Sequence, residues 1–413
     1  MSAVSTTTPR ARFGPTATLR APGYGFLWTA SLLWNQARWM DQVVLGWTVL
    51  QITDSAWDVA LIGVLRSLPV MLLGVLGGAV ADRFERRRLL ISAQGLGAVV
   101  SLTVGVLLSL GALRFEHAVV AATLLGIQWA IDWPARRALI PDLVGRELTQ
   151  SAVVLESLSM SLTRVVGPMA AGWLIAYFSP AISYFVMASL YAGEILLLAA
   201  MPLRRRAPRP RTTSMLRYLR EGFAHMRVIQ PIVGVLLITI FMNAFAFPYQ
   251  QILPVFARDV FAVDAVGLGV LGAAYGVGAL IGAAALSTRP RVRRPGIAFA
   301  LGSGVMCTCL VGFALSGHFQ VSVLLLVVSG IGSASFSAFQ STIILRAAPE
   351  ELRGRAMGAL TLAIGTAPIG LLEIGALTEL VGAPLAVAAN AALCGLLVVA
   401  TAVALPRFRT SVD

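Results

Sequence analysis

Between two long apolar segments, the chain reads Gly78-Ala-Val-Ala-Asp82-Arg83-Phe-Glu-Arg86-Arg87-Arg88. Each flanking segment exceeds the roughly 20 apolar residues that a helix needs to cross a bilayer. The same character extends outward over all 413 residues, which are 57% hydrophobic and 12% charged, with a mean hydropathy of +0.82. Soluble domains carry about 25% charged residues, so the sequence predicts an all-α, polytopic membrane protein.

Apolar segments of spanning length recur along the chain, and we expect 12 transmembrane helices. They cover 24–50, 57–80, 89–111, 118–138, 150–177, 181–202, 230–256, 265–287, 296–316, 320–345, 356–381 and 384–405. A long polar stretch near the middle separates the sixth span from the seventh. The expected organisation is a disordered tail (1–22), a six-helix bundle (23–202), a basic linker (203–229), a second six-helix bundle (230–405) and a short tail (406–413).

The two halves resemble each other. Ile140-Pro141-Asp142-Leu143 follows the fourth span and Ala348-Pro349-Glu350-Glu351-Leu352 follows the tenth, so the two prolines are 349 − 141 = 208 positions apart. Such a parallel repeat predicts two six-helix bundles related by a pseudo-two-fold axis, with a transport pathway between them.

The basic residues indicate the orientation in the membrane. All 32 are arginine, and 27 of them fall on the side of the N-terminus when the spans alternate. Cytoplasmic loops carry the excess of positive charge, so both termini are expected in the cytoplasm of a bacterial cell, with the chain in the inner membrane. The net charge of +13 is explained by topology, and no nucleic-acid partner is expected.

Several motifs carry a family resemblance. The Gly78–Arg88 stretch resembles the cytoplasmic signature loop of the major facilitator superfamily. Arg164-Val-Val-Gly167-Pro168, Leu253-Pro254-Val-Phe-Ala-Arg258-Asp259 and Leu352-Arg353-Gly354-Arg355 resemble the drug/proton antiporter branch that includes macrolide-efflux and enterobactin exporters. The resemblance implies a secondary active exporter of a small amphipathic molecule, coupled to protons and working by alternating access.

Charged residues inside the spans are the first candidates for function, because a charge in the bilayer core costs a few kcal/mol and usually faces a cavity or a partner. Arg38 and Asp41 lie three residues apart on the first span, within reach of each other. We expect Asp41 to be the proton-coupling carboxylate and Arg38 its partner. A static pair that only fixes helix packing is the alternative.

Other intramembrane groups are candidates for the substrate site. Arg66 can receive an anionic group, pair with Asp41 or reach outward to the lipid headgroups; Arg164 is expected to pair inside the first half. Asp132 is interpreted as part of a solvated helix-end cluster with Arg136 and Arg137, a gate ion pair being the other possibility, and Glu194 and Glu373 as isolated carboxylates. The expected substrate-binding side chains are Trp34, Arg66, Arg164, Asn243, Tyr249, Gln250, Phe336 and Gln340. Uncharged polar groups among aromatic rings in the second half favour an amphipathic ligand over a strongly ionic one, although hydrogen bonds between helices explain at least half of them.

The signature loop predicts a conformational latch. By the resemblance, Asp82 lies near the helix start around Gly354, where the positive end of the helix favours a carboxylate. Arg83 and Arg86 then pair with acidic helix ends, and the latch consists of Gly78, Asp82, Arg83, Arg86 and Gly354. It would hold the halves together on the cytoplasmic side.

Other classes of function are disfavoured. The three histidines are scattered, and the sequence has no metal-ligand, nucleotide-loop or nucleophile motif, so no enzyme activity, metal or cofactor is expected. Gly267-Leu-Gly269-Val-Leu-Gly272 is interpreted as a helix-packing motif, since no strand precedes it. The expected partners are a small-molecule substrate, protons and the lipid bilayer, for a monomer. An importer of the same superfamily and a non-transporting scaffold or sensor remain the alternatives.

Overall fold

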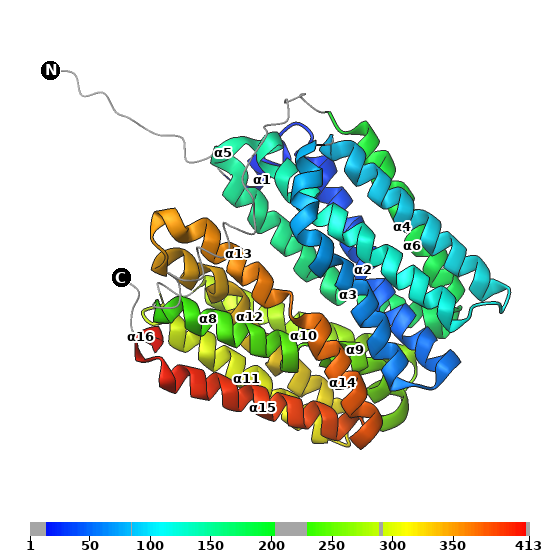
Figure 1. The fold of residues 1–413 in the computed structure, drawn as a ribbon. Helices are drawn as coiled ribbons and strands as arrows, with labels where there is room; N and C mark the ends of the chain where they lie inside the picture. The colour runs from blue at the N-terminus through cyan, green and yellow to red at the C-terminus, as the bar shows by residue number, and fades with distance from the viewer. Residues whose placement is uncertain (1–13, 84, 203–228, 289–291, 410–413) are drawn as a thin grey trace.

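The computed structural model describes residues 14–83, 85–202, 229–288 and 292–409. Within these ranges the secondary structure is helical, and the helices form two bundles that lie side by side (Figure 1). In the part of the chain that the structure describes, ten helices are long and apolar enough to cross a membrane. The first two long helices are not among the ten, although they have 30 and 28 residues, so the count of 12 spans stays a prediction.

The N-terminal bundle contains α1 (Pro15–Leu19), α2 (Tyr24–Thr53), α3 (Ala56–Arg83), α4 (Arg86–Ser109), α5 (Phe115–Tyr177) and α6 (Pro180–Ala200). The continuous assignment of α5 covers two spans, Phe115–Gly145 and Glu147–Tyr177. Gly145 separates them because its φ of 74° and ψ of 174° are not helical, and a residue without a Cβ adopts positive φ at little cost.

The C-terminal bundle contains α8 (Gln230–Phe241), η2 (Met242–Ala246), α9 (Tyr249–Val255), η3 (Phe256–Val260), α10 (Ala265–Ser287), α11 (Pro295–Leu315), α12 (Phe319–Ala347), η4 (Glu350–Leu352), α13 (Arg353–Ile364), α14 (Ala367–Val381), α15 (Ala383–Ala404) and α16 (Pro406–Arg409). The seventh expected span, 230–256, is thus interrupted by one π-helical turn, η2, and a second, η3, begins at its end. Pro248 and Pro254 lie beside them, and a proline removes a backbone donor and displaces the turn before it.

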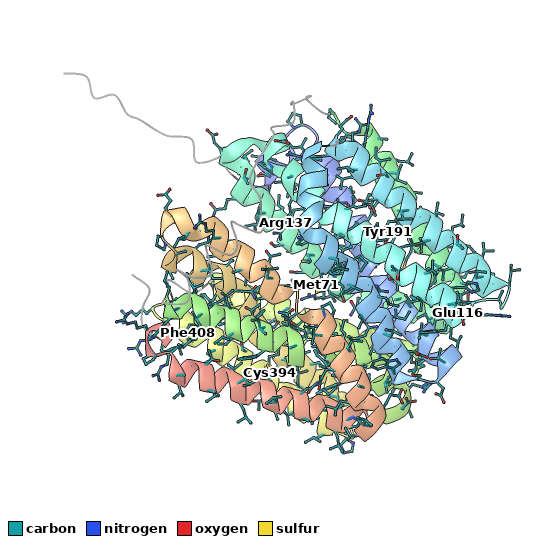
Figure 2. All side chains as sticks on the ribbon, viewed as in Figure 1. Met71, Glu116, Arg137, Tyr191, Cys394 and Phe408 are labelled. Atoms are coloured by element: carbon teal, nitrogen blue, oxygen red, sulfur yellow. The ribbon has the colours of Figure 1, made fainter. Side chains whose placement is uncertain are left out.

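Side chains are distributed as a lipid environment requires. Tyr191 and Cys394 lie within the N-terminal and C-terminal bundles (Figure 2), and both are buried. Large apolar side chains on the outer surface are exposed, including Leu110, Leu196 and Leu380. A soluble surface cannot sustain many such residues, whereas lipid tails cover them. The polytopic membrane fold is therefore confirmed.

The two bundles contact each other through α5 with α10 and α3 with α14. A Cβ on Gly172 of α5 would lie 2.3 Å from the Ala265 carbonyl oxygen, and one on Gly269 of α10 would lie 2.7 Å from that of Pro168. The glycines therefore allow the two backbones to approach closely. The packing interpretation of the Gly267–Gly272 motif is confirmed.

Hydrogen bonds between the bundles gather at one end of the molecule. Arg258 Nη2 lies 2.5 Å from Asp54 Oδ1, and its Nη1 donates to the Leu50 carbonyl at 3.0 Å. Ser55 Oγ and the Trp57 N–H each donate to Glu379 Oε1 at 3.0 Å. We call the set formed by Asp54, Ser55, Trp57, Arg258 and Glu379 the clasp.

The ends of the chain differ in part from expectation. Pro15–Leu19 forms the helix α1, with Thr18 buried, in a range where a disordered tail was expected. Pro406–Arg409 forms α16, whose Phe408 is buried against Gly234. Residues 1–13, the linker 203–228 and residues 410–413 lie outside the described residues, so the domain boundaries stay a proposal.

Candidate functional site

Asp41 is paired, but with Arg66 rather than Arg38. Arg66 Nη2 lies 2.5 Å from Asp41 Oδ2, and the Tyr184 hydroxyl donates to Asp41 Oδ1 at 3.1 Å. Helices α2, α3 and α6 supply these three groups, and Asp41 is buried. The predicted Arg38–Asp41 pair is therefore wrong. The reason is orientation: spacing along one helix allows contact, but here a neighbouring helix offers the closer cation.

Arg38 lies instead among tryptophans. Its guanidinium carbon is 3.8 Å from the ring centroid of Trp129, 5.2 Å from that of Trp39 and 5.8 Å from that of Trp34. Ring faces attract cations through their quadrupole. Among the described residues no carboxylate pairs with Arg38, and its buried Nη1 has no hydrogen-bond partner.

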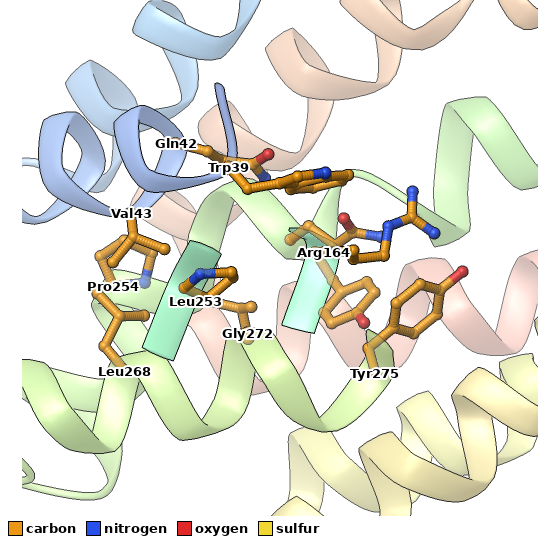
Figure 3. A pocket seen from close by; sticks show the side chains of 12 residues that line it. Trp39, Gln42, Val43, Arg164, Leu253, Pro254, Leu268, Gly272 and Tyr275 are labelled. Atoms are coloured by element: carbon orange, nitrogen blue, oxygen red, sulfur yellow. The ribbon is translucent and has the colours of Figure 1, made fainter. Parts of the chain in front are cut away.

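A pocket lies at the contact between the bundles (Figure 3). Its volume accessible to water is about 30 Å³, and its walls include Trp39, Gln42, Arg164, Tyr249, Gln250 and Tyr275. Arg164 lies between two rings, 4.7 Å from the centroid of Trp39 and 5.4 Å from that of Tyr275. Three of the predicted binding residues, Arg164, Tyr249 and Gln250, thus share one pocket. Arg164 was expected to pair inside the first half; among the described residues its contacts are these two rings, and no ion pair is seen.

The remaining polar candidates of the second half lie elsewhere. Asn243 Nδ2 donates to the Thr239 carbonyl at 2.9 Å, and Gln340 Nε2 donates to Thr239 Oγ1 at 2.8 Å. Phe336 stacks on Phe299 with centroids 5.2 Å apart. The contacts of Gln340 and Phe336 join helices of the C-terminal bundle, as the packing alternative expects. Asn243 instead binds the carbonyl one turn earlier in its own helical segment.

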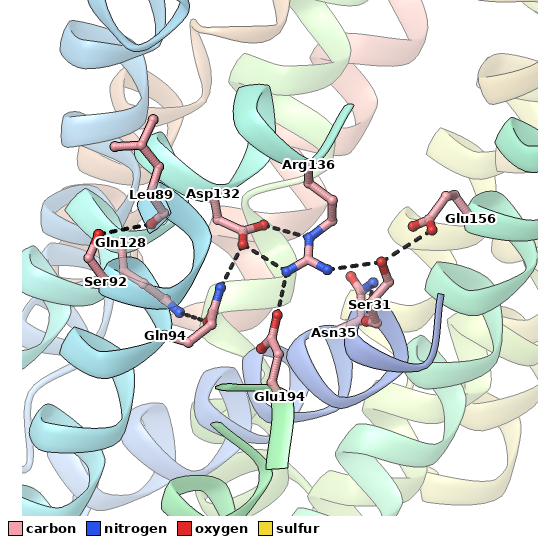
Figure 4. Close-up of polar contacts among 10 residues, drawn as sticks. All are labelled: Ser31, Asn35, Leu89, Ser92, Gln94, Gln128, Asp132, Arg136, Glu156 and Glu194. Carbon is pink, nitrogen blue, oxygen red and sulfur yellow. Dashed lines mark hydrogen bonds and ion pairs between the residues drawn. The ribbon is translucent and has the colours of Figure 1, made fainter. Parts of the chain in front are cut away.

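A buried polar network surrounds Arg136 (Figure 4). The sequence did not predict this central residue as part of a buried site. Arg136 binds Asp132 through Nε and Nη2 at 2.9 and 2.8 Å, donates to Ser31 at 3.0 Å and forms an ion pair with Glu194. Asp132 and Glu194 are fully buried. The solvated cluster expected for Asp132 and the isolation expected for Glu194 are both wrong; Arg136, expected on the cytoplasmic surface, is buried as well.

Uncharged groups complete this network. Gln94 Nε2 donates to Asp132 Oδ1 at 2.6 Å, and Gln128 Nε2 donates to Gln94 Oε1 at 2.7 Å. Ser31 Oγ donates to Glu156 Oε1 at 3.2 Å. The spacing of Asp132 and Arg136 by four residues was the available signal, since such residues face each other on a helix.

The predicted latch is described only in part. Arg86 Nη1 donates to the Ala138 carbonyl at 2.9 Å and pairs with Asp142, which fits the expected contact with an acidic helix end. Gly354 lies exposed in the first turn of α13. The side chains of Gly78, Asp82 and Arg83 lie outside the described residues.

The last two observations concern the carboxylate of Glu373 and the possibility of a metal site. Glu373 accepts a hydrogen bond from Asn390 Nδ2 at 2.6 Å, so it has a partner inside the C-terminal bundle. Across the described ranges, no group of three His, Cys, Asp or Glu side chains is placed to hold a metal ion.

The chain is similar to known proteins in sequence and in fold. Residues 13–412 match the profile of a family described as transmembrane secretion effector. The chain is 30% identical over 372 residues to the enterobactin exporter EntS of Shigella boydii, covering 87% of each sequence. It is 26% identical over 258 residues to the staphyloferrin A transporter of Staphylococcus aureus, covering 62% of this chain and 64% of that protein. A solved POT family transporter in complex with 5-aminolevulinic acid has the same fold, with a TM-score of 0.74 at 11% identity over 94% of this chain and 96% of that one.

Proposed function

We propose that this chain, which belongs to the transmembrane secretion effector family of the major facilitator superfamily, exports a small siderophore-like molecule in exchange for protons. The protein is a multi-pass membrane transporter, and the relatives named above are transporters rather than enzymes. The substrate, the direction and the coupled ion are parts of the proposal.

The ion pair of Asp41 with Arg66 carries the proposal. Both groups lie in the N-terminal bundle, on helices α2 and α3, which both contact α9 of the other bundle. A buried carboxylate that loses its cationic partner binds a proton, and it releases the proton when the partner returns. A shift of α2 relative to α3 that accompanies the movement of the bundles and separates Asp41 from Arg66 would therefore couple protonation to the opening of the pocket. Arg66 takes the modulating role first assigned to Arg38.

The clasp supports alternating access. It joins the loop between α2 and α3 to η3 and α14, so the bundles are held together at that end. With the orientation inferred from the arginines, this end faces outward, and the pocket would communicate with the cytoplasm. A monomer in a bacterial inner membrane, with both termini in the cytoplasm, is the simplest form of the proposal.

Uptake into everted membrane vesicles tests the function. Vesicles energised by respiration should accumulate enterobactin or staphyloferrin A, with erythromycin and ethidium as the wider panel. Asp41→Asn should abolish accumulation against a gradient and leave downhill movement, because a permanently neutral side chain cannot exchange a proton.

The control is Glu116→Gln, which removes an exposed carboxylate at the start of α5 and should leave accumulation unchanged. Normal uphill accumulation by Asp41→Asn would place coupling at another residue. Accumulation in right-side-out vesicles alone would favour the importer.

A further inference from the structure

Hydrogen-bond donors without acceptors lie in the pocket and next to it: Trp39, Arg164 and Tyr249 line it, and Arg38 contacts Trp39 and Trp129 beside that lining. The buried nitrogens Arg38 Nη1, Arg164 Nε, Trp39 Nε1 and Trp129 Nε1 have no partner, and neither has the Tyr249 hydroxyl. A buried donor without an acceptor is destabilising because it has lost its hydrogen bonds to water, and native proteins leave few of them. Apart from the hydroxyl, which can also accept, every one of these atoms can only donate. A concentration of unmatched donors fits a ligand rich in acceptors.

The arginines inside the N-terminal bundle differ in how their charge is matched. Arg66 faces Asp41, and Arg136 faces Asp132 and Glu194. Arg38 and Arg164 contact aromatic rings instead, and among the described residues no carboxylate pairs with either. They also lie close enough to repel each other. An aromatic face attracts a cation but carries no negative charge that would neutralise it, and a charge inside the membrane usually has a partner of opposite sign. This part of the bundle interface therefore carries two unmatched positive charges.

The two guanidinium groups share one side chain. Arg38 lies 5.2 Å from the Trp39 centroid and Arg164 lies 4.7 Å from it, so the two guanidinium carbons are at most 9.9 Å apart, the sum of those distances. Arg164, Trp39 and Tyr249 line the pocket. Arg38 is next to this lining through its contact with Trp39, and the separation of the two cations is within the length of a small molecule with two acidic groups.

We propose that Arg38 and Arg164 form the anion site for the transported substrate, which carries two acidic groups, carboxylates or acidic phenolates, on a partly aromatic body. The inference rests on the proposed function and specifies its ligand. One acidic group binds each guanidinium, Trp39 packs against the flat part of the molecule, and the Tyr249 hydroxyl donates to a remaining oxygen. This site differs from the expectation of a ligand held mainly by uncharged groups. Arg66 is excluded from the site because Asp41 already matches its charge.

Calorimetric titration of the purified protein in detergent tests the site without any transport. The probes are terephthalate, which has two carboxylates on one ring, benzoate, which has one, and the neutral dimethyl terephthalate. Terephthalate should bind at least about tenfold more tightly than benzoate, because a second charge-assisted hydrogen bond forms, and the diester should bind weakest.

Variants assign the binding to the two arginines. Arg38→Gln and Arg164→Gln should each bring terephthalate affinity down to about that of benzoate, and Arg38→Lys should retain part of the difference. Arg137→Gln is the matched control, since Arg137 also lies over a tryptophan, 4.3 Å from the Trp133 centroid, but is exposed and contacts a different tryptophan from the Trp39 that Arg38 and Arg164 share. Its affinities should equal those of the wild type. Elution as a single symmetric species in size-exclusion chromatography establishes that each variant is folded.

The outcomes separate this inference from the proposed function. Equal affinity for terephthalate and its diester, or unchanged affinity in both glutamine variants, overturns the anion site, and export in vesicles then still decides the function. Selective terephthalate binding that depends on both arginines supports the site. If the same protein moves no siderophore in vesicles, the anion site stands while the export proposal fails.

Discussion

Arg136 forms ion pairs with two buried carboxylates, so losing the Arg136 charge and losing one carboxylate charge should affect stability differently. Removing the guanidinium leaves Asp132 and Glu194 without a cation, whereas removing the charge of Glu194 leaves the Asp132–Arg136 pair intact. Breaking a buried pair so that a charge remains costs about 3–5 kcal/mol. We therefore predict that Arg136→Gln lowers the thermal midpoint of the purified protein by far more than Glu194→Gln.

The measurement is thermal unfolding in detergent, monitored as the loss of the monodisperse peak in size-exclusion chromatography. Asp132→Asn combined with Arg136→Gln should recover part of the loss, because one of the two stranded carboxylates is then gone. If Glu194→Gln is as damaging as Arg136→Gln, Arg136 is not the centre of the network.

The same residues indicate the limit of sequence analysis. The sequence placed Arg136 near the cytoplasmic surface because the fourth span was expected to end at residue 138, whereas the helix continues to Gly145. Asp132 and Arg136 are four residues apart and could be paired from their spacing. Glu194 is 58 positions away in α6, and only the packing of α6 against the rest of the bundle brings it to Arg136. The sequence left the Asp41–Arg66 pair as one of several alternatives, because this pair also joins two different helices.

Among the helices, the α5–α10 contact depends on glycine. A methyl group on Gly172 would lie 2.3 Å from the Ala265 carbonyl oxygen, which is backbone and cannot rotate away. Gly172→Ala should therefore push α5 from α10 while each bundle stays folded, because the strain falls between the bundles. We predict increased access to the pocket from the clasp end and reduced transport.

Access is measured by labelling a single cysteine at Gln250, in a background where Cys307, Cys309 and Cys394 are Ala, with an impermeant maleimide in right-side-out vesicles. Gly95→Ala is the control, because a Cβ there meets nothing within 4 Å. Equal labelling in Gly172→Ala and Gly95→Ala would argue against a glycine-dependent closure.

At this scale, the sequence predicted which segments are helical better than which helices meet. Long apolar segments require helices in a bilayer, since backbone groups have no other partners there. The glycine spacing in α10 predicted close packing, but α5 as its partner depends on the tertiary arrangement. The π turns at Met242–Ala246 and Phe256–Val260 were not predicted, because proline indicates a disturbance of a helix without specifying its form.

For the molecule as a whole, the repeated Pro-acidic motif predicted two halves, and the bundles bear this out. The end at which they close was not predictable. A transporter populates arrangements that differ by a few kcal/mol, and one sequence has to be compatible with all of them. The predicted latch at Asp82 and the observed clasp belong to opposite ends, which is what an alternating cycle requires: one set of contacts forms as the other breaks.

This alternation leads to a prediction about the clasp. Ser55 Oγ and Glu379 Oε1 are 3.0 Å apart across the two bundles, so cysteines at both positions can be joined by a short bismethanethiosulfonate reagent. In the cysteine-free background, cross-linking Ser55→Cys to Glu379→Cys should stop transport, because the bundles must separate at this end to release substrate, and a reducing agent should restore it. A cross-link between Arg114→Cys and His117→Cys, which are neighbours within one bundle, should leave transport unchanged. Undiminished transport by the fully cross-linked Ser55–Glu379 protein would mean that the clasp does not open during the cycle, and rocking of the two bundles about the pocket would have to be abandoned as the mechanism.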